Sequence, residues 1–111
     1  MKYEDYREAI QETFRMCEEV LVQKHAEYSS TYSPFHNFCA AGEIIGESPF
    51  KALEGMMVKH TVSVYDMLKE PYLYPMSKWD EKIIDHINYL AILRAMLIDA
   101  QITSEGIECV K

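Results

Sequence analysis

Positive charge is scarce in this chain, which has 11 Lys and Arg against 18 Asp and Glu and a formal net charge of −7. Lysine and arginine form no long cluster anywhere in the sequence. Proteins that wrap duplex nucleic acid need a basic patch to neutralise its phosphates, so we do not expect this mode of binding.

Cysteine and long apolar runs are also sparse. Three cysteines, Cys17, Cys39 and Cys109, are too few and too scattered for a disulfide framework, and no CxxC pair indicates zinc. No run reaches the roughly 18 apolar residues of a membrane span, and the acidic N-terminus MKYEDYREAI does not resemble a signal peptide. We therefore expect reduced thiols in a cytoplasmic protein that makes no use of a membrane.

Familiar catalytic motifs are missing as well. The four glycines form no phosphate-binding loop, no serine lies in a nucleophile elbow, and no two histidines have the spacing of metal ligands. What the chain does have is apolar residues that recur every three to four positions, which predicts helices. We expect an all-α, compact four-helix bundle in a single domain, 1–111, with an irregular tail at 101–111. The four helices are expected at 3–28, 37–45, 49–69 and 78–99.

Several helix ends carry recognisable capping residues. Gly46 suits the position just after the second helix, and Ser48 followed by Pro49 suits the start of the third. Ser77 with Asp80 resembles a capping box for the fourth. The first helix should bury one apolar face, formed by Tyr6, Ile10, Phe14, Cys17, Leu21 and Tyr28.

The fourth helix carries polar residues on a line that should be buried. Glu81, Asp85 and Asn88 share one face, and the same line continues through Ile92. Such groups need partners inside a bundle, because an unpaired buried charge is costly. One interpretation is a Mg²⁺ site in which Glu81 and Asp85 hold the metal against nucleotide phosphates. The other is an ordinary internal ion pair.

The third helix offers the complementary groups. Lys59, His60 and Ser63 could bind a phosphate, although a lone histidine on an apolar face is often only a core residue. Small residues on the same line, Ala52 and Gly55, would permit close approach of another helix. If the third and fourth helices pack antiparallel, the two polar lines enclose a pocket, and Lys59 or His60 is the cationic partner of Asp85.

An aromatic segment, 28–38, follows the first helix and includes Tyr28 and Asn37. It is expected either to cover the core or to contact a ligand. Together with the broad apolar third helix, it exceeds what a chain of this size needs to bury, which favours a homo-oligomer.

Four segments carry a resemblance: KHAEY, PFHNF, GMMVKHTVSVYDM and WDEKIIDHINYL. Across residues 20–98 the chain resembles small phage-encoded proteins that are similar to nucleotide-modification-associated domains. More distantly, it resembles the MazG-like and dimeric-dUTPase-like pyrophosphohydrolases. The resemblance implies an oligomeric all-α protein that handles nucleotides, with Glu81 and Asp85 as the acidic pair of the last core helix and with Asn88 and Tyr89 completing that motif.

The chain departs from the enzymes in its acidic motifs. Their last-helix pair is spaced ExxD, whereas Glu81 and Asp85 are spaced ExxxD, and their earlier ExxE pair has its only match here in the tail, at Glu105 and Glu108. We therefore expect capture (sequestration) of a nucleotide or a nucleotide-derived immune signal, with Lys59, His60, Ser63, Asp85, Asn88, Tyr28 and Asn37 as ligand-binding residues. The alternatives are an Mg²⁺-dependent nucleoside-triphosphate pyrophosphohydrolase and a structural or protein-binding bundle.

Overall fold

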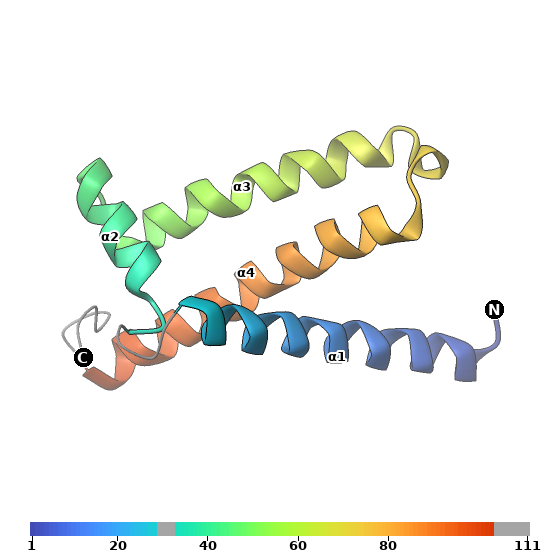
Figure 1. The fold of residues 1–111 in the computed structure, drawn as a ribbon, viewed down its shortest axis with the longest axis horizontal. Helices are drawn as coiled ribbons and strands as arrows, with labels where there is room; N and C mark the ends of the chain where they lie inside the picture. The colour runs from blue at the N-terminus through green and yellow to red at the C-terminus, as the bar shows by residue number, and fades with distance from the viewer. Residues whose placement is uncertain (29–32, 104–111) are drawn as a thin grey trace.

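The computed structural model describes residues 1–28 and 33–103. All regular elements in these residues are helices. The elements, shown in Figure 1, are α1 (Tyr3–Tyr28), α2 (His36–Ile45), α3 (Pro49–Leu68), the 3₁₀ turn η1 (Pro71–Leu73) and α4 (Met76–Thr103). The predicted all-α bundle of four helices is confirmed. In the part of the chain described here, no helix is long and apolar enough to cross a membrane.

Helix α4 lies at the centre of the molecule and packs on both α1 and α3, while α2 packs across the first turns of α3 (Figure 1). The core is formed where α2, α3 and α4 meet. Phe38, Leu53 and Met96 are its buried centre, and the half-buried side chains of Tyr89 and Ile92 pack against them. α4 is therefore the element that positions residues from all the others.

The joint between α2 and α3 follows the predicted caps. Gly46 ends α2 with a left-handed φ of 70°, and the amide of Glu47 donates to the carbonyl of Gly42 at 2.8 Å. The Ser48 hydroxyl accepts a hydrogen bond from the amide of Lys51 at 3.2 Å, and Pro49 is the first residue of α3.

Close helix approach depends on a different glycine from the one predicted. A Cβ built on Gly42 would lie 2.9 Å from the carbonyl oxygen of Glu47, so only glycine fits where α2 meets the start of α3. Gly55 is exposed and has nothing within 4 Å of its would-be Cβ. The prediction for Gly55 is wrong because that side of α3 faces away from the neighbouring helices, whereas Ala52 is buried.

The start of α4 also differs from the prediction. The helix begins at Met76, and the carbonyl of Pro75 accepts from the amides of Lys78 at 3.0 Å and Trp79 at 3.2 Å, so Ser77 lies inside the first turn and does not cap it. The indole N–H of Trp79 donates to the carbonyl of Pro71 at 3.0 Å and fixes this end to η1. At the other end α4 continues to Thr103, so 101–103 are helical, and 104–111 lie outside the described residues.

One cysteine contradicts the expectation of three reduced thiols. Cys39 is disulfide-bonded. Cys17 is free and buried in α1, where burial raises the pKa of its thiol. Cysteine spacing could not predict the bond, since a disulfide depends on which segments the fold brings together.

The bundle is elongated because the first half of α1 extends away from the other helices that the structure describes (Figure 1). The molecule measures 47 × 28 × 25 Å, and its radius of gyration of 16.2 Å exceeds the value of about 13 Å for a compact domain of this length. Residues 1–12 are all exposed. The apolar face predicted for the first helix is therefore buried only in part: Cys17 is buried, but Tyr6, Ile10 and Phe14 are exposed.

Candidate ligand-binding site

A cavity of about 430 Å³ lies where the second half of α1, the segment leading into α2, and α4 meet. Its volume falls within the range of roughly 300–1,000 Å³ typical of small-molecule sites. The polar and aromatic side chains that line it include Lys24, Phe35, Asn37, Asp85, Asn88 and Tyr89.

Asn88 is the buried polar residue of this cavity, with 5% of its surface exposed. Its amide N–H donates to the backbone carbonyl of Cys17 at 3.2 Å, which ties α4 to α1. That bond fixes the orientation of the side chain, because only the nitrogen end can donate to a carbonyl. Among the described residues, the Oδ1 atom of Asn88 has no hydrogen-bond partner.

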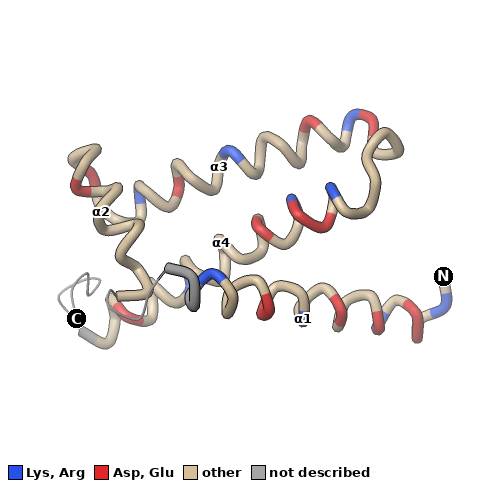
Figure 2. The backbone as a smooth tube through the Cα atoms, viewed as in Figure 1, with Lys and Arg blue, Asp and Glu red and all other residues tan. Residues whose placement is uncertain are grey.

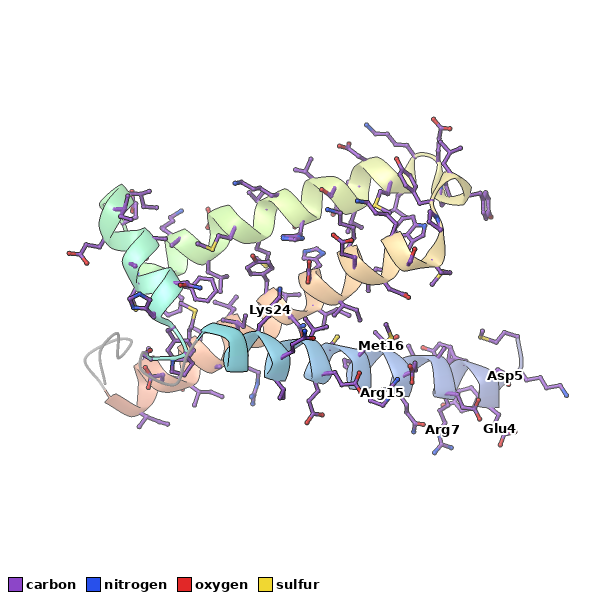
Figure 3. All side chains as sticks on the ribbon, in the orientation of Figure 1. Glu4, Asp5, Arg7, Arg15, Met16 and Lys24 are labelled. Carbon is purple, nitrogen blue, oxygen red and sulfur yellow. The ribbon has the colours of Figure 1, made fainter. Side chains whose placement is uncertain are left out.

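Asp85 lies one turn before Asn88 and faces a cation from α1. The Nζ of Lys24 is 3.6 Å from its Oδ1 atom, with the two side chains 54% and 22% exposed, respectively. Figure 3 shows Lys24 close to the point where α1 crosses α4. The predicted ion-pair partner, Lys59 or His60, is wrong, because Lys24 of α1 forms the ion pair with Asp85.

His60 lies beside the wall of the cavity. Its ring contacts the ring of Tyr89, with 5.0 Å between the centroids, and its Nδ1 atom is buried without a partner among the described residues. Burial lowers the pKa of His60; the negative charge of Asp85 acts in the opposite direction, and nearby positive charges, Lys82 first among them, lower it further. His60 therefore binds a proton less readily than a free histidine and packs against Tyr89.

The cavity gathers part of the predicted ligand-binding set. Asn37, Asp85 and Asn88 line it. Lys59 is exposed on α3 and Ser63 is half-buried, and neither lines the cavity. The predicted pocket lay between the polar lines of the third and fourth helices, whereas this cavity lies on the α1 side of α4. The side chain of Tyr28 lies outside the described residues.

The predicted magnesium ligands, Glu81 and Asp85, are not joined by further metal-binding side chains among the described residues. Glu81 is exposed, and the carboxylate of Asp85 faces Lys24. Within residues 1–28 and 33–103, no three His, Cys, Asp or Glu side chains are grouped so that they could hold a metal ion. The described residues thus do not supply the donor set that Mg²⁺ bound between two helices would need.

The sequence prediction missed Lys24 and Phe35 as cavity residues. Lys24 follows Leu21 by three positions on the face of the first helix that was expected to be buried, so helical periodicity alone could have placed it there. Phe35 belongs to the aromatic segment, but its contact with the cavity depends on how residues 33–38 turn into α2.

No family model, curated protein or solved structure matches this chain. Its function is therefore inferred from the residues of the cavity and from the resemblance noted in the sequence.

Proposed function

We propose that this protein captures a nucleotide or a nucleotide-derived signal in the cavity between α1, α2 and α4, without hydrolysing it. The observation that carries the proposal is the buried Oδ1 atom of Asn88, which lines the cavity and has no partner among the described residues. An unsatisfied buried acceptor costs about 1–3 kcal/mol. A ligand with an N–H donor would remove this cost.

The wall formed by α4 suits the edge of a nucleobase. Asp85 and Asn88 lie three residues apart on one face and offer a carboxylate and an amide oxygen as acceptors. The exocyclic amino groups of guanine, adenine and cytosine each carry two donor hydrogens, one for each acceptor, whereas uracil offers a single N–H. Phe35 and Tyr89 also line the cavity, and aromatic side chains stack on the flat face of any base.

Lys24 is the group that would contact a phosphate. It is the only lysine or arginine among the described residues that line the cavity. A single ammonium suits one phosphate or a phosphodiester better than a triphosphate, whose charge usually requires Mg²⁺ or several cations. This favours a nucleotide-derived signal over a nucleoside triphosphate.

The alternative functions account less well for these features. A pyrophosphohydrolase needs several carboxylates around Mg²⁺, and the described residues do not gather them. A purely structural bundle would not explain why the Oδ1 atom of Asn88, which has no hydrogen-bond partner among the described residues, lies beside an open cavity. The resemblance to phage-encoded proteins agrees with capture of an immune signal inside a bacterial host.

Calorimetric titration with GMP, AMP, CMP and UMP tests the proposal, together with pyrophosphate release from nucleoside triphosphates in Mg²⁺. We expect the protein to bind at least one amino-bearing nucleotide more tightly than UMP and to release no pyrophosphate. Asn88→Leu should abolish binding, Lys24→Ala should weaken it about tenfold, and Lys59→Ala should leave it unchanged.

Two results would overturn capture. Turnover in Mg²⁺ that Glu81→Gln abolishes would make the protein an enzyme, and the absence of both binding and cleavage would exclude every nucleotide function. Circular dichroism of each variant shows whether a loss of binding reflects a loss of helix.

A further inference from the structure

The first half of α1 carries an apolar stripe formed by Tyr3, Tyr6, Ile10 and Phe14, here called the α1 stripe. These side chains are 76%, 51%, 43% and 61% exposed. Spacings of three and four residues place them on one face of the helix, and the rings of Tyr3 and Tyr6 lie 5.9 Å apart. The described part of the chain therefore leaves a continuous apolar face in water.

The same face is buried farther along the helix. Cys17 follows Phe14 by three residues and packs on α4, where its carbonyl accepts the hydrogen bond from Asn88. The α1 stripe thus continues this packing surface past the point where α1 and α4 diverge (Figure 1). A surface of this kind is typical of a helix that packs on a further partner.

The acidic residues in the first half of α1 lie on its other side, while Arg7 borders the α1 stripe beside Phe14. Glu4, Glu8 and Glu12 are spaced four residues apart, and at about 100° per residue they fall roughly opposite the α1 stripe. Figure 2 shows the acidic positions spread along α1, and Figure 3 shows Glu4 on the side away from the other helices. Arg15 bridges Glu12 and Glu19 within the helix. The α1 stripe can therefore be covered without burying a carboxylate, and the long side chain of Arg7 at its border can keep its charged end in water.

Helix α3 also exposes apolar residues, but its patch is shorter and is bounded by charge. Val58, Val62 and Tyr65 are at least half exposed. The ion pairs Lys51–Glu54 and Asp66–Lys69 lie at the two ends of this patch. Covering more than these three residues would require desolvating the paired charges, which is unfavourable.

We propose that the α1 stripe is the contact surface for a second copy of this chain, with the two α1 helices packed antiparallel about a twofold axis near Ile10. In such an interface each stripe covers its counterpart, so one apolar face is enough. An aromatic side chain buries roughly 150–250 Å², so the exposed parts of the four side chains amount to about 500 Å² per copy. Two copies bury about 1,000 Å², which is the lower limit for a specific interface.

Light scattering coupled to size exclusion, at tens of micromolar, tests this surface. The parent chain should be a dimer, and Ile10→Glu should be a monomer, because it places a charge at the centre of the contact. The matched control is Val58→Glu, which places the same charge on the exposed face of α3 and should remain a dimer. Circular dichroism checks that both variants keep their helix content.

A cross-linking variant tests the antiparallel packing of the two α1 helices, and it replaces only an exposed side chain. Ile10→Cys lies next to the proposed axis, so mild oxidation should join two copies covalently, whereas Val58→Cys should not be joined. A monomeric parent would overturn the proposal. So would a dimer that persists in Ile10→Glu, one that Val58→Glu breaks, or efficient cross-linking through Val58→Cys and not through Ile10→Cys.

Discussion

The ion pair between Lys24 and Asp85 lies partly in solvent and joins α1 to α4 at the edge of the cavity. Its 3.6 Å separation and the 54% exposure of Lys24 make it a surface pair rather than a buried one. Exposed pairs contribute about 0.2–1 kcal/mol, whereas breaking a buried pair costs about 3–5 kcal/mol. The sequence analysis placed Asp85 inside the bundle, where the larger cost would apply.

Asp85→Asn should lower the free energy of unfolding by less than about 1 kcal/mol. The amide keeps the shape of the carboxylate and loses only the attraction to Lys24. Urea denaturation measures the change, and Lys24→Gln is the matched variant, which should give a similar loss. A loss of about 3 kcal/mol or more in Asp85→Asn would contradict the exposed geometry.

His60 should make the fold sensitive to acid. Burial lowers its pKa, so the unfolded chain binds a proton more readily than the folded one. Stability is unaffected by His60 well above the unfolded pKa of about 6.5 and decreases as the pH falls below it, until the folded histidine is itself protonated.

Urea midpoints at pH about 7.5 and about 5.5 test this effect of His60. The parent should lose stability between the two values, and His60→Phe, which keeps a ring against Tyr89, should lose less. An equal loss in both proteins would show that other groups account for the acid sensitivity.

At the scale of the elements, the joint between α2 and α3 is held by the close contact at Gly42. A Cβ there would meet backbone atoms of Glu47 and Ser48 at 2.9–3.0 Å, and backbone cannot move aside as a flexible side chain can. Gly55, on exposed α3, has no such neighbour within 4 Å.

Gly42→Ala should destabilise the protein by about 1–3 kcal/mol, as overpacking does. Gly55→Ala should stabilise it by up to about 1 kcal/mol, because alanine favours the helix. Thermal or urea denaturation should therefore show a loss of stability in Gly42→Ala and a gain in Gly55→Ala. Stabilisation by both would show that α2 and α3 are less tightly joined.

The helices themselves could be predicted largely from local signals. Periodicity and the cap residues Gly46 and Ser48 placed α1, α2 and α3 to within one residue of their ends. The start of α4 was missed because the carbonyl of Pro75 begins that helix and Ser77 does not. The partner of Asp85 could not be predicted, since Lys24 is distant in sequence and nothing local shows which helix covers which face of α4.

At the scale of the whole molecule, an elongated chain with an exposed apolar face and a net charge of −7 combines two opposing tendencies. The α1 stripe favours association of two copies, while like charge opposes it. The proposed dimer should therefore strengthen as salt screens the repulsion.

Raising NaCl from about 0.05 M to about 0.5 M should tighten the dimer several-fold in analytical ultracentrifugation, because the screening length shortens over this range. An interface held by ion pairs would instead weaken with salt. A dissociation constant that rises with salt would contradict an apolar contact between the two α1 helices.

The central claim is that a nucleotide occupies the cavity beside Asn88, and chemical-shift mapping tests it most directly. In a titration of ¹⁵N-labelled protein with GMP, AMP, CMP and UMP, we predict that the side-chain amide of Asn88 and the backbone of residues 33–38 and 85–92 shift most with an amino-bearing nucleotide. Lys59 and Ser63 on α3 should shift little. Shifts centred on α3, or no shifts at millimolar concentrations of any of the four nucleotides, would contradict the account.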